Sequence, residues 1–109
     1  MSIPLKLRKQ ISEDPFMKVC IHKMYRGEVG TGELQWEHAL LYGGKQIQES
    51  WAIVPCRKSF NVDATGKTKR FNQYIALLRA TDEDLSKYPK KDWKQLKRRF
   101  EDEFGLINI

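Results

Sequence analysis

The chain has 109 residues, of which 40% are hydrophobic and 11% aromatic. This composition is typical of a globular protein and excludes a disordered one, and the length fits one domain with a modest core. Lys and Arg number 20 against 14 Asp and Glu, which gives a formal net charge of +6. Such a charge favours a polyanionic partner, usually nucleic acid. The alternative is a basic surface that serves solubility alone.

Hydropathy and cysteine content indicate the cellular compartment in which the chain is expected to work. No apolar run approaches the roughly 18 residues of a membrane span, and the N-terminus lacks the apolar core of a signal peptide. Two cysteines in a chain without an export signal indicate a reducing compartment. We therefore expect a cytoplasmic protein with no membrane association, whose cysteines are thiols or metal ligands rather than a disulfide.

The N-terminal part of the chain is predicted to be extended. Within residues 1–15, the alternation of Ile3, Leu5 and Leu7 favours a short extended segment, and two prolines argue against one continuous helix. Residues 16–26 are rich in β-branched and aromatic side chains, which predicts a strand or a short knuckle.

The central part of the chain is predicted to form a hairpin. Three glycines within residues 27–33 indicate a turn. The segments 32–42 and 50–55 are then expected to pair, with Gly43-Gly44 in a connection longer than a two-residue turn.

The pattern changes to helical spacing in the C-terminal half. Apolar residues recur every three or four positions over residues 67–80, which predicts an amphipathic helix. Thr81, followed by three acidic residues, predicts the cap of a short second helix. A third helix is expected to end at Gly105 and to present one apolar stripe, which consists of Trp93, Leu96, Phe100 and Phe104.

The stretch WEHALLYGGKQIQESWAIVPC places a Glu37-His38 pair before a glycine turn and a short apolar run that ends in Cys56. This frame resembles the HNH, or ββα-metal, endonucleases, particularly their small phage-type members. The tail FNQYIALLRATDEDLSKYPKKDW is similar to tails that follow the core in such phage proteins. The resemblance implies an α+β fold in a single HNH-like domain over residues 1–109. It comprises a hairpin-helix core at about 18–65 and a helical extension at about 66–105 with two further helices.

The same resemblance implies a nuclease site with a divalent metal, Mg²⁺ or Mn²⁺. His38 corresponds to the general base and Glu37 to an acidic metal ligand; the alternative is a structural pair in which the two side chains bond to each other. Phe60 falls where the family's metal-binding histidine belongs, and a phenyl ring cannot ligate a hard cation. Asn61 is the nearest residue with a suitable oxygen. We therefore expect a partly degraded site with weak or absent cleavage.

A structural zinc ion is common in proteins of this kind. Cys20, His22 and Cys56 are the candidate ligands, and Cys20 and His22 would share one face of an extended strand. Three soft ligands approach a closed tetrahedral site without completing it. The alternative is two buried free cysteines that act as small hydrophobes. Either metal could therefore be absent.

Two basic segments are candidates for contact with phosphates, independently of the motif. The alternative is a solvated helix face that the acidic run at residues 101–103 balances. The predicted nucleic-acid-binding residues are Arg57, Lys58, Lys67, Lys69, Arg70, Lys90, Lys91, Lys94, Lys97 and Arg98.

Three functions follow from these observations. The first is an HNH-endonuclease-like DNA-binding protein of phage or prophage origin, in the host cytosol, with a partly degraded nuclease site. The second is an active metal-dependent endonuclease that uses Glu37 and His38. The third is an interaction factor on an HNH scaffold that binds another protein or a second copy of itself. Double-stranded DNA is the expected partner in the first two.

Overall fold

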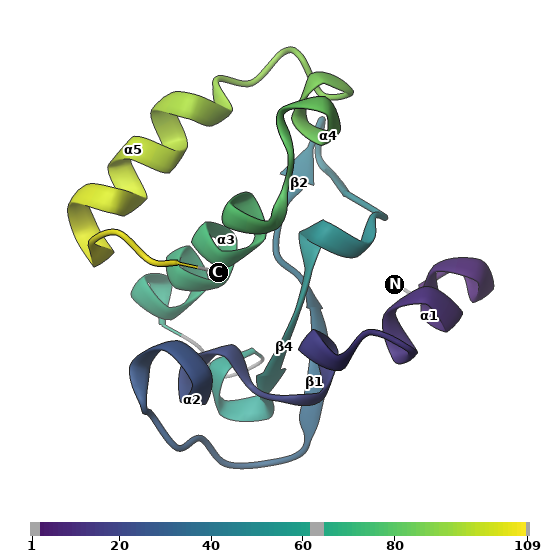
Figure 1. Cartoon of the computed structure of the whole chain (residues 1–109), viewed down its shortest axis with the longest axis vertical. Helices are drawn as coiled ribbons and strands as arrows, with labels where there is room; N and C mark the ends of the chain where they lie inside the picture. Colours follow the sequence, from purple (N-terminus) through teal and green to yellow (C-terminus); the bar gives the residue numbers. More distant parts are fainter. Residues whose placement is uncertain (1–2, 62–64, 109) are drawn as a thin grey trace.

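A computed structural model describes residues 3–61 and 65–108. The fold is α+β, with two short antiparallel sheets followed by helices (Figure 1). The elements in chain order are α1 (Leu5–Ser12), η1 (Pro15–Lys18), α2 (Ile21–Arg26), β1 (Leu34–His38), β2 (Leu41–Tyr42), β3 (Lys45–Gln46), η2 (Ser50–Ala52), β4 (Ile53–Arg57), η3 (Lys58–Phe60), α3 (Gly66–Arg79), α4 (Asp82–Ser86) and α5 (Trp93–Phe104).

The main sheet consists of β1 and β4, which pair antiparallel with Glu37 opposite Val54 and His38 opposite Ile53. Side chains alternate along a strand, so His38 shares a face with Trp36, whereas Glu37 points to the other face. Residues of α1 and η1 cluster with Ile53 and Trp36 on the first face. Helix α3 covers the Glu37 face, so the strand pair runs between α1 and α3 (Figure 1). The predicted pairing of residues 32–42 with 50–55 is confirmed in outline.

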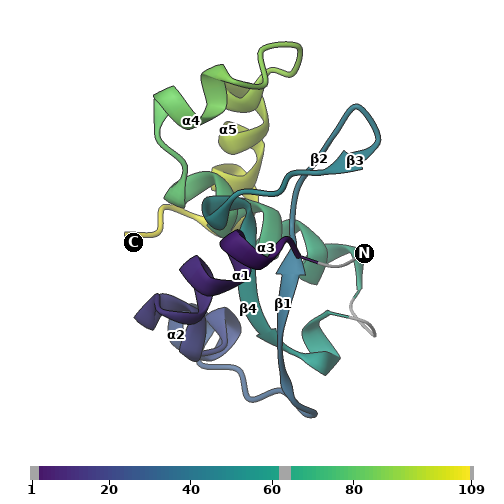
Figure 2. The ribbon, with the colours of Figure 1, turned by 90° about the vertical axis from the view of Figure 1, so that its right-hand side faces the viewer.

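The connection between β1 and β4 contains a hairpin of its own. Strands β2 and β3 pair antiparallel, and Gly43 and Gly44 form the turn with φ of 60° and 77°. Two successive positive φ values are what a type I′ turn requires, and glycine adopts them without strain. Figure 2 shows this hairpin projecting away from the main sheet.

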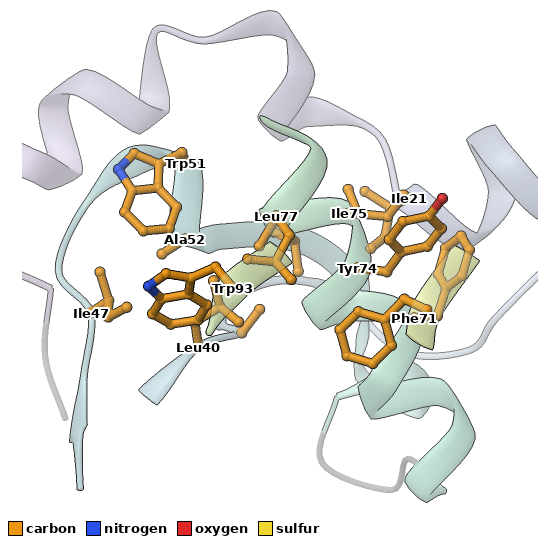
Figure 3. Packing of buried hydrophobic residues seen from close by; sticks show 14 residues of the cluster. Ile21, Leu40, Ile47, Trp51, Ala52, Phe71, Tyr74, Ile75, Leu77 and Trp93 are labelled. Carbon is orange, nitrogen blue, oxygen red and sulfur yellow. The ribbon is translucent and has the colours of Figure 1, made fainter. Parts of the chain in front are cut away.

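The core lies between the main sheet, α3 and α5. Phe71, Tyr74 and Leu77 of α3 are at most 1% exposed, and Trp93 and Phe100 of α5 belong to the same cluster. Figure 3 shows the α3 side chains directed toward neighbouring elements, among them Ile21 of α2. Burial of large side chains is the main stabilising contribution, at roughly 1.5–3 kcal/mol for each. In the described parts of the chain, each helix is too short or too polar to cross a lipid bilayer.

All three predicted C-terminal helices are confirmed. The helix expected at 67–80 is α3, which begins one residue earlier and is capped by Thr65. Thr81 caps α4 through a reciprocal capping box with Asp84. The apolar stripe of α5 faces the core, and the helix ends at Phe104, immediately before Gly105. Local periodicity and capping chemistry specify these helices.

The extended prediction for the N-terminal part is wrong. Residues 5–12 form α1, because Leu7 and Ile11, four positions apart, are buried together on one side of a helix. Pro4 stands at the N-cap of this helix, where its missing N–H leaves no bond unmade. The strand expected at 16–26 is also absent: η1 and α2 occupy this segment, and Gly27 ends α2 with a φ of 65°.

The glycine-rich segment before β1 lies against η3, and this close approach yields a stability prediction. A Cβ at Gly30 would lie 2.4 Å from Cε2 of Phe60, whereas a Cβ at Gly66 would meet only Arg70 Nη1 at 3.5 Å. We expect Gly30→Ala to lower the free energy of unfolding by about 1–3 kcal/mol through overpacking.

Urea denaturation measures this difference, with Gly66→Ala as the matched control. The control should leave stability unchanged or raise it by up to about 1 kcal/mol, because alanine restricts the unfolded chain. Equal effects of the two substitutions would contradict the close packing of Gly30 on η3.

Candidate functional site

The carboxylate of Glu37 is the centre of a buried polar network. The residue is 8% exposed, and its Oε1 accepts a hydrogen bond from Lys69 Nζ at 2.6 Å. Its Oε2 accepts a second bond from Asn72 Nδ2 at 2.5 Å. Lys69 and Asn72 are three positions apart on α3, so one face of the helix presents both to the strand. The ammonium group supplies the charge that a buried carboxylate needs.

His22 extends this network to α2. Its Nε2 lies 2.7 Å from Asn72 Oδ1, and because that oxygen can only accept, Nε2 carries the proton. The ring is fully buried and stacks on Phe60 with centroids 4.1 Å apart. Its Nδ1 is buried without a hydrogen-bond partner in the described residues. Burial lowers the pKa of His22, and the nearby Arg26 guanidinium lowers it further, so the ring is neutral near pH 7.

The two cysteines are both buried and free. Cys56 Sγ donates a hydrogen bond to Glu37 Oε2 at 3.6 Å. Burial raises the pKa of the Cys56 thiol, and the negative charge of Glu37 raises it further. The thiol therefore stays protonated, which is the form of a buried structural cysteine and not of a nucleophile.

The predicted zinc ligands do not fit a zinc site in the arrangement they adopt. His22 bonds Asn72 through Nε2, so only its Nδ1 could face a metal, and Cys56 donates its proton to Glu37, whereas zinc binds thiolates. Cys20 precedes α2 as its N-cap residue, so Cys20 and His22 do not share the face of a strand. Over residues 3–61 and 65–108, there is no group of three or more His, Cys, Asp or Glu side chains that could hold a metal ion.

The predicted oxygen ligands of the nuclease site, Glu37 and Asn61, lie close together, but both accept a hydrogen bond from Lys69. Asn61 Oδ1 accepts a hydrogen bond from Lys69 Nζ at 3.3 Å, and the same ammonium lies 2.6 Å from Glu37 Oε1. Asn61 Nδ2 in turn donates to Gln35 at 3.0 Å. A divalent cation would need the position that this ammonium already occupies. The two oxygens therefore do not fit a metal while Lys69 holds its present place.

His38 lies apart from the Glu37 network. Its Nε2 is 2.8 Å from Gln48 Oε1, and its side chain is on the opposite face of β1 from that of Glu37. The structural pair in which His38 bonds to Glu37 is therefore not formed. A surface pocket of about 310 Å³ lies at this end of β1, and the residues that line it include Glu37, His38, Lys69, Gln73 and Lys91.

The predicted nucleic-acid-binding residues divide into two groups. Lys69 and Arg70 are held by carboxylates, since Arg70 makes two bonds of 2.7 Å to Glu103. The other eight have no ion pair in the described residues, and all but Lys97 are exposed. These eight are Arg57, Lys58, Lys67, Lys90, Lys91, Lys94, Lys97 and Arg98.

Sequence reasoning missed the residues that hold Glu37. Asn72 was not singled out, and Lys69 was assigned to the phosphate-binding surface. A signal for Asn72 exists, because it is a polar residue within the buried stripe of α3, between Phe71 and Ile75. A buried amide needs hydrogen-bond partners, so this position alone predicts a polar contact.

Comparisons with known proteins leave the resemblance to HNH endonucleases untested. No family model, no curated protein and no solved structure matches this chain.

The lowered pKa of His22 predicts a pH dependence of stability. The unfolded chain takes up a proton near the ordinary value of 6.5, whereas folded His22 resists it. Stability should be full above about pH 6.5 and fall as the pH drops below this value, by up to roughly 1.4 kcal/mol per pH unit. Urea unfolding between about pH 7.5 and pH 5.5 measures this slope.

The control for this measurement compares the two histidines. His22→Gln keeps a side chain that can donate to Asn72 and should flatten the pH dependence. His38→Gln should retain it, because His22 is unchanged. A dependence that disappears in His38→Gln and persists in His22→Gln would show that the wrong histidine has been assigned.

Proposed function

We propose that this chain binds double-stranded DNA through the cationic surface of α5 and the segment before it. The observation that carries this proposal is a set of six cations over residues 90–99 with no ion pair in the described residues. Five of the six are exposed and Lys97 is half-buried. Cations that form no direct ion pair can attract phosphates, and counterions are released when the phosphates bind. The six residues are Lys90, Lys91, Lys94, Lys97, Arg98 and Arg99.

The geometry of α5 supports this proposal. Trp93 and Phe100 face the core, so these aromatic residues fix the orientation of the helix and are not available for base stacking. Lys94 and Arg98 are four positions apart and Lys97 adjoins them, so these three lie together on the outer face. Contacts of this kind position a duplex without specifying its sequence. We therefore propose binding with little sequence preference.

The proposed scaffold is HNH-like. The order β1, connection, β4 and α3 supports it, because it is the ββα order that the resemblance implies, with Glu37 and His38 near the end of the first strand. Helix α3 also presents polar side chains to Glu37. We propose that the nuclease site on this scaffold is partly degraded, and that the ammonium of Lys69 neutralises Glu37 in place of a divalent metal.

Charge reversal on α5 tests DNA binding. We expect the triple variant Lys94→Glu, Lys97→Glu, Arg98→Glu to bind duplex DNA much more weakly than the unmodified chain. The slope of log affinity against log salt should flatten by about 2.7, because each lost phosphate contact removes about 0.9. Fluorescence anisotropy with a labelled duplex at several salt concentrations measures both quantities.

The matched control is the reversal of three exposed cations on α1, Lys6→Glu, Arg8→Glu and Lys9→Glu, which changes net charge equally. Its salt slope should stay close to that of the unmodified chain. If the two triple variants lose affinity and slope equally, net charge and not the surface of α5 accounts for binding.

Cleavage of DNA is a second candidate function, favoured by the pocket that His38 and Lys91 line together with Glu37 and Lys69. A histidine there can accept a proton from water, and Lys91, which has no ion pair in the described residues, can hold a phosphate. We propose that cleavage is weak or absent, because Lys69 occupies the position between Glu37 and Asn61.

Removal of this ammonium tests the proposed degradation. Lys69→Ala leaves the Glu37 and Asn61 oxygens without their cation, so the variant should bind Mn²⁺ more tightly than the unmodified chain. Calorimetry or the shift in melting temperature with added Mn²⁺ measures this gain. In the control Glu37→Gln, Lys69→Ala, which lacks the carboxylate, the gain should disappear. Plasmid nicking by the unmodified chain that is robust and lost in His38→Ala would overturn the proposal of a degraded site.

A further inference from the structure

A second pocket lies at the start of β1, at the opposite end of the strand from His38. Its volume is about 320 Å³, and it is formed by η1, α2, the glycine-rich segment and the end of β4. Three cationic side chains line it, those of Lys18, Lys23 and Arg57, and no carboxylate does. The lysines belong to a part of the chain that sequence reasoning assigned to a strand and to no binding surface.

The glycine-rich wall of this pocket is fastened to the rest of the fold. The backbone N–H of Thr31 donates to Ser59 Oγ at 2.9 Å, and the backbone N–H of Ser59 donates to the Thr31 carbonyl at 3.2 Å. A third bond joins the Lys58 N–H to the Glu33 carbonyl at 3.0 Å. Gly30 also lies directly against Phe60. The pocket is therefore formed before any ligand arrives, which lowers the entropic cost of binding.

Among the residues that the structure describes, none forms an ion pair with these three cations. Lys18 and Lys23 are exposed and have no ion pair or side-chain hydrogen bond in the described residues. Arg57 donates from Nη1 to the Gly32 carbonyl at 3.2 Å, which orients the guanidinium and leaves its charge uncompensated.

The two carboxylates of the glycine-rich segment, Glu28 and Glu33, form contacts with neighbouring residues. Glu28 pairs with Arg26 at 2.8 Å, and Glu33 accepts a hydrogen bond from Gln35. Three like charges around one pocket repel one another until an anion enters. An anion bound there is therefore stabilised by all three cations together.

We propose that this pocket is a binding site for a phosphate group. An arginine with fixed orientation offers a planar pair of donors to phosphate oxygens, and two flexible lysines add point charges. The volume equals roughly ten water molecules, which suits one phosphate group with part of its substituent and excludes a base pair. The group could be a terminal phosphate monoester or a phosphodiester of a nucleic-acid backbone. The site does not depend on the binding of DNA by α5.

Inorganic phosphate is the probe for the first test. Two-dimensional ¹H–¹⁵N NMR titration at constant ionic strength, with chloride as the exchanged anion, should show saturable shifts at residues around Lys18, Lys23 and Gly30. In the variant Lys18→Gln, Lys23→Gln the affinity for phosphate should fall about tenfold or more, because two charge-assisted contacts are lost. The control Lys6→Gln, Lys9→Gln has the same change in net charge and should bind phosphate within about twofold of the unmodified chain.

Short duplexes with and without a 5′-phosphate identify the source of the group. If Lys18→Gln, Lys23→Gln weakens binding of the phosphorylated duplex alone, the site takes a terminal monoester; if it weakens both equally, the site takes a backbone phosphodiester. The proposal is overturned if phosphate causes no shifts beyond those of chloride, or if the double variant binds phosphate as well as the control does. Loss of DNA binding by the α5 variant with phosphate binding intact would separate the two sites.

Discussion

The interaction on which the rest of the structure depends is the burial of the Glu37 carboxylate between the main sheet and α3. A carboxylate removed from water costs several kcal/mol unless a positive charge and hydrogen bonds replace its hydration. Lys69 supplies the charge, and Asn72 supplies a further donor. Both come from the first two turns of α3, so this requirement fixes the rotation of α3 about its axis and its position along the sheet.

The burial of the Glu37 carboxylate also constrains elements that do not contact it. Asn72 can hold the carboxylate only if its amide is oriented, and the bonds to Phe60 and His22 orient it. Burial lowers the pKa of His22 and keeps the ring neutral, and its Nε2–H donates to the amide oxygen of Asn72. The short helix α2, the turn η3 and α3 are in this way joined to β1 by one chain of hydrogen bonds. A partly satisfied network of this kind would be less stable than an apolar core, and the orphaned Nδ1 of His22 is its weakest point.

Much of the fold could be predicted from the sequence where the signals are local. The capping box of α4 lies within four residues, from Thr81 to Asp84, and the apolar stripe of α5 repeats within one helix. The local signal in α1 is ambiguous, because Ile3 and Leu7 fit both an alternating and a four-residue spacing. Contacts with Ile53, far along the chain, favour the helix. From the sequence, the candidate site could be predicted only as a set of residue types and not as a set of contacts. Glu37 and Lys69 are separated by 32 positions, and no spacing rule indicates that they pair.

The division of positive charge follows from this core. Of twenty lysines and arginines, five form ion pairs within the described residues: Arg26, Lys69, Arg70, Arg79 and Lys87. The pair of Lys69 with Glu37 is the only one of these with a largely buried carboxylate, at 9% exposure of the side chain. Its cation cannot serve a phosphate without exposing an uncompensated charge.

The cations on the outer face of α5 and around the pocket at the start of β1 do not neutralise a buried carboxylate. The helix cations are placed there because the apolar stripe of α5 must face the core. The pocket cations lie around one pocket because η1, α2 and the end of β4 meet the glycine-rich segment there. Packing, rather than local charge, therefore decides which cations of this basic chain are available to a polyanion.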